Sequence, residues 1–414
     1  EAGPEGWAPS WFFFHPDLDA ILREGVARFP NVDVHLEHVA EAIEQGEDHA
    51  VVVARDLGTG EVRRIATRYV LGCDGAGSTC RKQAGIGFES LGFDQDWLVV
   101  DVALQSDVDL PRIPRQVCDP ARIVTMVPNV RRLRRWEFQL RPGEHPAEME
   151  QPARVWELLA PWLKPDDAEL IRAVVYTFHG TVAPRWRDRH LFLLGDAAHQ
   201  MPPFLGQGMC SGIRDAANLS WKLGLVLDGK APAALLDSYE AERRPHAQDT
   251  VEWGVACGRL IDAFAAHEGG TGPEPSEEDK RSAYGGNRAL RTLAGGVLQK
   301  NPPPGAPIGT NFPQTRRPGL RLDDCVGERF AVFARTQPDA ALSARSRAFL
   351  DAVDARRFAI ADVDDALGSL ALHFADYHAV VVRPDRYVFG VARTPEDLEP
   401  LVLELQHVLG GRSA

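Results

Sequence analysis

An acidic residue and a glycine-rich turn follow one short apolar run of this sequence. Residues 191–194 predict a buried strand, because a continuous apolar run ends there in a turn residue, Gly195. Asp196 follows directly, so the strand would present a carboxylate at its end. From Gly208 onward apolar residues recur every three or four positions until Asp228-Gly229, which predicts a helix that stops there. This strand, turn and helix form an arrangement suited to a ligand.

The turn itself is built from small and rigid residues. Small residues let the backbone lie close to a flat ligand, and prolines stiffen the approach. Free N–H groups at the start of a helix favour negative charge, as a phosphate or as the anionic edge of a reduced ring. The alternative, core packing with no ligand, explains neither Asp196 nor the Gly-Gln-Gly of residues 206–208. The small residues are Ala197, Ala198, Gly206 and Gly208, and the rigid ones are Pro202 and Pro203.

A second glycine motif lies upstream, in residues 68–87. An expected strand over 69–73 runs into Gly75-Ala76-Gly77 and then a helix, which is part of a dinucleotide-binding fingerprint. The match fails at the third glycine, where Cys80 stands. Asp74 and Ser78 can cap the following helix instead. Arg81 then lies on its first turn, near any bound phosphate, so capping alone and ligand binding both fit this motif.

Composition sets outer limits on function. The 414 residues allow two or three domains, and 44% hydrophobic with 25% charged residues is ordinary for a globular protein. A formal charge of −13 argues against a nucleic-acid partner, and RRLRR at 131–135 is interpreted as a solvated strand or turn. The six cysteines are scattered, which favours a reducing cytoplasm. No apolar run approaches the roughly 20 residues of a membrane span.

Together the two motifs resemble those of a known family. CDGAGSTCRK, then LLGDAAHQMPPFLGQGM and SYEAERRPHA further along, resemble the FAD-dependent aromatic monooxygenases of the para-hydroxybenzoate hydroxylase type. Within this group Pro202-Pro203, Cys210 and residues 213–215 resemble the 3-(3-hydroxyphenyl)propionate hydroxylase branch. The resemblance covers most of residues 11–250 and, more loosely, the chain to about residue 410.

The resemblance implies a cofactor role for each motif. Asp196, with Gly195 before it, would accept a hydrogen bond from the ribityl chain of FAD, and Pro203 and Phe204 would lie beside the ring. Asp74-Gly75 would touch the flavin side and the path of NADH or NADPH. For Asp215 and Asn218, hydrogen bonds to neighbouring elements fit at least as well as ligand contacts. Backbone N–H groups facing the N1/O2 edge of the flavin would come from Gly206, Gln207, Gly208 and Met209.

Two departures from the family pattern stand out. His15 replaces the usual Gln in the helix expected over residues 12–22, and no GxGxxG occurs in the chain. We therefore expect a Rossmann-like FAD/NAD(P)-binding domain lacking its first half, and weak or no FAD binding by these 414 residues alone. Three alternatives remain open: a fragment, an enzyme whose second chain supplies the GxGxxG half, or a protein that has lost flavin.

The expected fold class is a mixed α/β chain (α+β mixed). Alternation predicts a β-meander within residues 31–72, further strands from WLVVDVAL at 97–104 to residue 182, and one helix near 152–163. The tail resembles the thioredoxin-like domain of the family, but with Cys325 alone it lacks a dithiol. The expected domains are 1–96 (part of the FAD-binding domain), 97–182 (antiparallel substrate sheet), 183–293 (FAD-binding domain and helices), 294–319 (Pro/Gly linker) and 320–414 (thioredoxin-like).

Other chemistries fit less well. Asp196 with His199 or His35 with His38 could be offered as metal ligands, but we expect no metal site. There is no GxSxG, and Cys210 has no evident His partner for covalent hydrolysis. The resemblance implies that NAD(P)H reduces FAD, that oxygen adds at C4a, and that the hydroperoxide hydroxylates a phenolic or larger aromatic compound. The catalytic base stays unassigned, a homodimer is one expected assembly, and the alternatives are a non-catalytic remnant and a flavin-fold protein repurposed for cyclisation.

Overall fold

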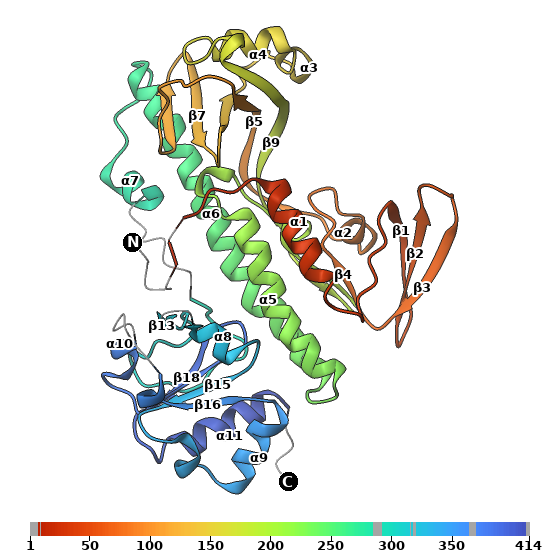
Figure 1. Cartoon of the computed structure of the whole chain (residues 1–414), viewed down its shortest axis with the longest axis vertical. Helices are drawn as coiled ribbons and strands as arrows, with labels where there is room; N and C mark the ends of the chain where they lie inside the picture. Colours follow the sequence, from red (N-terminus) through yellow and green to blue (C-terminus); the bar gives the residue numbers. More distant parts are fainter. Residues whose placement is uncertain are drawn as a thin grey trace.

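The computed structural model describes most of the chain: residues 7–8, 10–284, 292–314, 316–317, 320–363 and 370–410. Two long helices, α5 (Gly208–Leu227) and α6 (Asp237–Glu268), run through the middle of the molecule (Figure 1). The predicted helix from Gly208 is confirmed, with Asp228 as its C-cap. Among the described residues no helix is both long and apolar enough to span a membrane.

A six-stranded antiparallel sheet lies at one end of the two helices, in the order β12-β9-β5-β8-β7-β6 (Figure 1). One face packs against α3 (Pro146–Met149) and α4 (Pro152–Leu159), and the other faces α6 at Trp97 and Ile123. The predicted helix over 152–163 ends earlier, at Leu159, because Pro161 cannot donate a backbone hydrogen bond. The strands are β5 (Glu89–Leu104), β6 (Arg115–Asp119), β7 (Arg122–Pro128), β8 (Leu133–Gln139), β9 (Ala168–Val182) and β12 (His199–Gln200).

A short sheet beside α5 joins the two glycine motifs through a pair of parallel strands. β4 (Val70–Gly72) runs parallel to β11 (Leu191–Leu193), and β10 (Arg187–Asp188) pairs antiparallel with β11. Both predicted strands are confirmed to within a residue or two. A short helix, α2 (Thr79–Gln83), follows β4.

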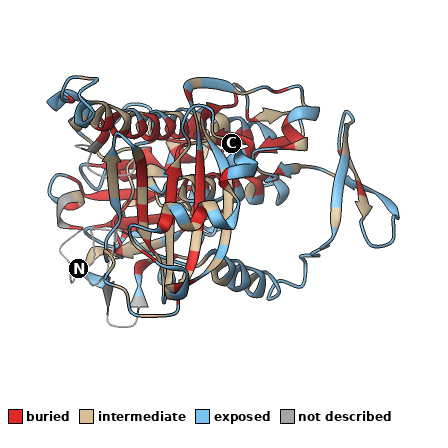
Figure 2. Ribbon diagram, turned by 90° about the horizontal axis from the view of Figure 1, so that it is seen from above, coloured by how far each residue is buried: buried red, intermediate tan, exposed pale blue. Residues whose placement is uncertain are grey.

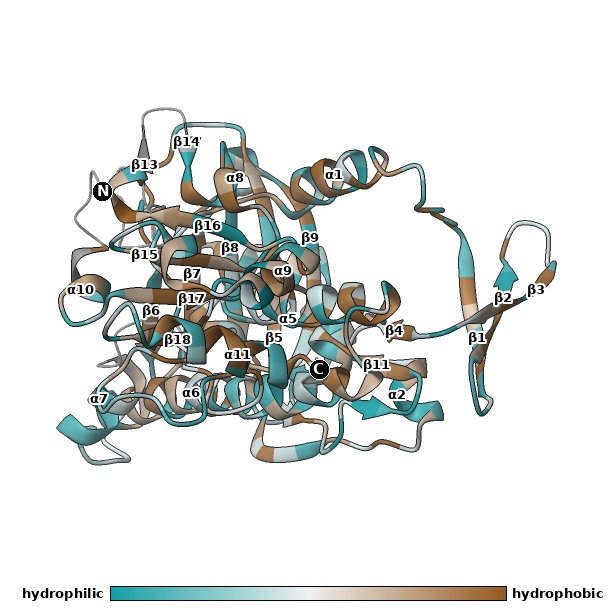
Figure 3. Ribbon diagram, turned by 90° about the horizontal axis from the view of Figure 1, so that it is seen from below, coloured by the Kyte–Doolittle hydropathy of each residue, from teal (hydrophilic) through white to brown (hydrophobic). Residues whose placement is uncertain are grey.

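A three-stranded meander stands apart from the core, with exposed residues on its two outer strands and none on the central one (Figure 2). It consists of β1 (His38–Gln45), β2 (Ala50–Asp56) and β3 (Val62–Thr67). The meander expected within residues 31–72 begins only at His38, because Glu37 adopts a left-handed φ of 55° that interrupts an extended run. Before the meander, α1 (His15–Val26) has no buried residue, and hydrophobic residues recur along its ribbon (Figure 3).

The C-terminal module lies at the other end of α5 (Figure 1). Its sheet has the order β16-β15-β17-β18, with β15 and β16 parallel and β17 antiparallel to its neighbours, as a thioredoxin-like fold requires. In the expected linker, residues 315, 318 and 319 lie outside the described part. The remaining elements are α7 (Glu277–Tyr284), β13 (Arg316–Arg317), β14 (Leu320–Arg321), α8 (Leu322–Val326), β15 (Ala331–Ala334), α9 (Ala344–Ala352), β16 (Arg356–Ala359), α10 (Ala371–Phe374), β17 (Ala379–Val382), β18 (Val388–Ala392) and α11 (Leu398–Val408).

Candidate active site

The two glycine motifs, about 120 residues apart in sequence, meet in the structure. β4 and β11 are parallel neighbours, with Gly72 paired to Leu193. The carboxyl ends of parallel strands open at the same edge of a sheet, and ligands bind there in open α/β sheets. Asp74-Gly75 and Gly195-Asp196 therefore leave the sheet side by side.

The turn after β11 packs closely on helix α5. Gly195 has a left-handed φ of 57°, and a Cβ placed on it would lie 3.7 Å from the Cα of Gly212. This glycine-to-glycine contact holds the turn against the helix, while Asp196 remains exposed. Desolvation by the surrounding protein raises the pKa of Asp196, and His199 offsets this only in part. The carboxylate is thus recessed but open on one side, as a ligand contact requires.

A buried carboxylate forms hydrogen bonds with residues of this turn. Asp215 of α5 accepts hydrogen bonds from Gly195 N (3.0 Å), His199 Nε2 (2.8 Å) and Arg243 Nε (2.9 Å). Burial alone would raise the pKa of Asp215, but His199, Arg243 and the Gly195 N–H outweigh it and lower the pKa. The expectation that Asp215 bonds to neighbouring elements is confirmed. The contribution of Arg243 was not predicted. Residues 242–245 read ERRP, and this sequence does not show which of its two arginines is buried.

The start of α5 is open to solvent. A short 3-10 turn, Pro203–Leu205, leads to Gly206 with a left-handed φ of 62°, and no side chain caps the helix after Gln207. A Cβ at Gly206 would meet nothing within 4 Å, and one at Gly208 would meet only Met201, at 3.9 Å. The helix start therefore offers N–H groups and a positive dipole end on a surface with room for a flat ligand.

The turn after β4 is rigid. Asp74 accepts hydrogen bonds from Ser78 Oγ (2.6 Å) and Cys80 N (2.9 Å), and Ser78 Oγ caps α2 by accepting from Arg81 N (2.9 Å). Burial raises the pKa of Asp74, but these hydrogen bonds outweigh it and the pKa is lowered. The predicted capping is confirmed.

Arg81 is held inside this turn. Its guanidinium donates to the carbonyls of Ile86 (3.1 Å) and Ala76 (3.2 Å) and stacks on the Phe88 ring at 3.8 Å. A Cβ at Gly75 or at Gly77 would meet nothing within 4 Å, so the backbone beside Arg81 is open. Contact between Arg81 and a phosphate stays a prediction.

An aromatic cluster adjoins the 3-10 turn before α5. The Phe204 ring lies edge-on to Trp97 (5.5 Å), Phe93 (6.1 Å) and Phe178 (6.1 Å). Trp97 and Phe178 come from β5 and β9, so this cluster joins the turn to the large sheet. Trp97 and Phe93 are buried, so the half-buried rings of Phe204 and Phe178 are the ones that could border a planar apolar ligand.

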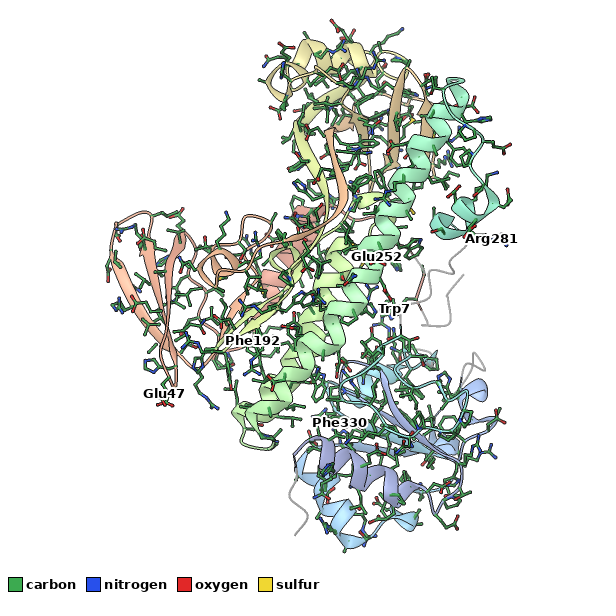
Figure 4. The ribbon with its side chains drawn as sticks, turned by 180° about the vertical axis from the view of Figure 1, so that it is seen from behind. Trp7, Glu47, Phe192, Glu252, Arg281 and Phe330 are labelled. Atoms are coloured by element: carbon green, nitrogen blue, oxygen red, sulfur yellow. The ribbon has the colours of Figure 1, made fainter. Side chains whose placement is uncertain are left out.

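A second buried polar cluster joins α6 to the C-terminal module. Glu242 accepts from Lys222 Nζ (2.8 Å), Arg383 Nη2 (2.6 Å) and Asn218 Nδ2 (2.7 Å), and from the backbone N–H of Val297 (2.7 Å). These four side chains are fully or almost fully buried. Burial alone would raise the pKa of Glu242, but the two cations and these hydrogen bonds lower it to about 2. Nearby, Trp221 of α5 packs edge-on against Phe330 at 5.3 Å, on the side of the module turned to α5 (Figure 4).

The residues at the meeting of the two turns fit the ring side of a flavin. Asp196 is an open acceptor for a hydroxyl, the start of α5 suits the negative edge of a reduced ring, and the open glycines leave room for both. His15, at the first position of α1, is exposed and lies 6.2 Å from the ring of Phe13. Among the described residues no group of three His, Cys, Asp or Glu side chains could hold a metal ion.

Two family models match the chain. Residues 7–254 match the model described as "FAD binding domain", and residues 309–408 match "HcaD C-terminal domain". A "Probable NADH-specific resorcinol 4-hydroxylase" of Rhodococcus jostii is 36% identical, over 97% of this chain and 77% of that protein. A "3-(3-hydroxy-phenyl)propionate/3-hydroxycinnamic acid hydroxylase" of Escherichia coli is 33% identical, over 98% of this chain and 78% of that protein.

Solved structures share the fold. The flavin-dependent monooxygenase PieE, in complex with FAD and substrate, superposes with a TM-score of 0.79 at 21% identity, over 95% of this chain and 79% of PieE. Aklavinone-11 hydroxylase, in a ternary complex with FAD and aklavinone, superposes with a TM-score of 0.78 at 22% identity, over 96% of this chain and 78% of that one.

Proposed function

The chain belongs to the family of FAD-dependent aromatic hydroxylases, and on that premise we propose that it hydroxylates a phenolic or larger aromatic compound with NADH or NADPH and oxygen. One atom of oxygen enters the ring and the other leaves as water, with two electrons from the nicotinamide. The observation that carries this proposal is the convergence of Asp196, the open start of α5 and the Phe204 cluster.

The proposed residue roles follow from this arrangement. Asp196 accepts a hydrogen bond from the ribityl chain, and the N–H groups of residues 206–209 stabilise negative charge at the N1/O2 edge of the ring. Pro203 and Phe204 lie beside the ring, and Asp74-Gly75 borders the path of the nicotinamide. Bound FAD would supply the redox chemistry by taking a hydride and passing one oxygen atom to the substrate. The chain excludes water and holds the substrate.

An uncovered surface supports the proposal that a further dinucleotide-binding unit docks on this chain. β4 has a free edge in the described part of the chain, and α1 exposes Ile21 (64%) and Leu22 (59%). An edge strand presents unpaired N–H and C=O groups that another strand can pair with, so such an edge favours a further βαβ unit. This unit would belong to the same polypeptide or to a partner chain, and the mass of the FAD-loaded protein by light scattering distinguishes these two assemblies.

The proposed function is tested with the full-length, FAD-loaded protein. It is supplied with NADH or NADPH and a panel of phenols that includes resorcinol and 3-(3-hydroxyphenyl)propionate, in an atmosphere of ¹⁸O₂. We expect phenol-stimulated oxidation of the nicotinamide and a product that carries one ¹⁸O atom. Nicotinamide oxidation without any labelled product would contradict hydroxylation, and a ring-closed product without ¹⁸O would support cyclisation instead.

A further inference from the structure

One face of the large sheet carries a row of polar side chains. Along β8, Trp136 and Phe138 point to the face covered by α3 and α4, where they join a buried apolar cluster. Glu137 lies between them in sequence, so its side chain points to the opposite face, the one turned towards α6. Its cross-strand neighbours there are Val99 on β5 and Thr125 on β7.

The other polar groups of this face are paired. Asp101 accepts from Arg135 Nε (2.7 Å) and Arg172 Nη2 (2.7 Å). Asp262 of α6 accepts from Gln95 (2.7 Å) and Gln139 (3.1 Å), and Thr125 donates to Gln116 (2.7 Å). Each of these groups therefore has its partner within the chain.

Glu137 is the exception. Its side chain is 7% exposed, and it makes no hydrogen bond or ion pair with any residue that the structure describes. Its oxygens are not among the fully enclosed polar atoms that lack a partner, so they keep a small exposure to solvent. An unpaired buried carboxylate is costly, and such groups in native structures call for an explanation.

Strand pairing places Glu137 relative to Phe204, the residue that we propose to border the flavin ring. Gln139 pairs with Trp97, whose ring contacts Phe204 at 5.5 Å. Glu137 lies two residues further along β8, a separation of about 7 Å. A single aromatic ring spans roughly this distance, so a phenol held beside Phe204 could direct its hydroxyl group to Glu137.

We propose that Glu137 binds the hydroxyl of the aromatic substrate and acts as the base that takes its proton, an inference that rests on the proposed function. The O–H bond breaks, the proton moves to a carboxylate oxygen, and the electron pair stays on the phenol oxygen. Delocalised into the ring, that pair activates the ortho carbon for its new bond to oxygen. Glu137 then releases the proton to water after the product leaves, so it is unchanged over the cycle.

The electrostatics of this face suit that role. Burial raises the pKa of Glu137 to about 7, Arg135 lowers it in part, and Asp101 raises it further. The other ionisable groups of this face are Cys118 on β6, Arg172 and Tyr176 on β9 and Asp262 on α6. A base whose pKa lies near the working pH is effective in general base catalysis.

The first test compares hydroxylation rates in the full-length, FAD-loaded protein, with resorcinol or another phenol that the parent hydroxylates. Glu137→Gln should lower the kcat of product formation about 10²- to 10⁴-fold, while phenol-stimulated NAD(P)H oxidation persists. The parent's kcat should rise as pH increases through about 7, whereas the variant's should not. Glu137→Asp should restore part of the rate. Glu169→Gln, an exposed glutamate of β9, is the matched control and should behave as the parent.

A second measurement does not depend on turnover. A phenol O–H that donates to Glu137 favours the ionised carboxylate, so binding of the same phenol near pH 6.5 should release a proton in the parent. Calorimetry in two buffers of different ionisation enthalpy measures this release, and Glu137→Gln should abolish it.

The outcomes separate the two proposals. Equal product rates, pH profiles and proton release in parent and Glu137→Gln would overturn the role of Glu137 and leave the proposed function intact. A parent protein that hydroxylates no phenol would overturn the proposed function and this inference together.

Discussion

Two buried glutamates in this molecule have opposite surroundings. Glu242, where α6 meets the C-terminal module, has two cations, an amide and a backbone N–H as partners, and its pKa is lowered to about 2. Glu137, on the face of the large sheet turned towards α6, has no such partners, and burial raises its pKa to about 7. The same residue type thus contributes to stability in one region and to reactivity in the other. Whether the fold supplies a partner decides between the two.

The largest expected effect comes from removing the charge at the paired site. Glu242→Gln leaves buried Lys222 without its carboxylate and Arg383 with Asp385 alone, and loss of one partner of a buried ion pair costs about 3–5 kcal/mol. Urea unfolding should show this loss. Glu252→Gln, an exposed position on the same helix (Figure 4), should change stability by less than about 0.5 kcal/mol. Equal free energies of unfolding for Glu242→Gln and Glu252→Gln would contradict a stabilising role for the buried Glu242.

The pH dependence of stability should distinguish the two glutamates by sign. The folded pKa of Glu137 lies above its unfolded value of 4.5, so its contribution to stability falls as pH rises from 4.5 to about 7, by about 3 kcal/mol. The folded pKa of Glu242 lies below 4.5, so its contribution is lost, by about 3 kcal/mol, as pH falls from 4.5 towards 2.

This sign is checked by unfolding the parent, Glu137→Gln and Glu242→Gln at a series of pH values. The free-energy difference between parent and Glu137→Gln should change above pH 4.5, and that between parent and Glu242→Gln below it. If both free-energy differences changed with pH in the same direction, the pKa shift assigned to one of the two glutamates would be wrong.

Asp196 extends the comparison, because it is a carboxylate that the fold leaves available to a ligand. Asp196→Ala should cost about 1.5–3 kcal/mol of FAD binding, or one to two decades in affinity, and should leave the fold intact. Fluorescence titration of the apoprotein with FAD measures this. Asp228→Ala, at the far end of α5, is the control, and FAD affinity that is equal in all three proteins would remove Asp196 from the cofactor site.

The smallest expected effect concerns Gly208. A Val side chain has room on the protein side, where Met201 is 3.9 Å away, but it would move the flavin edge from the start of α5. A lost dipole interaction of about 0.3–1 kcal/mol corresponds to a midpoint potential lower by roughly 6–20 mV for a two-electron couple. Gly224→Val, further along the same helix and also uncrowded, should leave the potential unchanged. An unchanged potential in the FAD-loaded Gly208→Val protein would assign the turn to packing alone.

The sequence predicts the local elements well and the buried polar network poorly. The strand before Gly195 and the helix from Gly208 follow from apolar periodicity and glycine, which act over a few residues. The start of β1 was misplaced because the left-handed turn at Glu37 has no glycine to signal it.

The two glutamates could not be distinguished from sequence. Arg383, which pairs with Glu242, lies 141 residues away, and Glu137 differs only in lacking such a partner. Both facts depend on tertiary packing, which no short pattern of residues encodes.

Helix α6 makes contacts at two separate regions, and this limits how its length can change in evolution or engineering. It bears Glu242 at the C-terminal module and Asp262 at the large antiparallel sheet, twenty residues later, which is about 30 Å along the axis and about 200° around it. A single inserted residue between them would turn one contact by about 100° relative to the other. We therefore expect the length of this segment to be fixed among relatives that keep both contacts, and grafting of a foreign C-terminal module to succeed only when the helical phase is preserved.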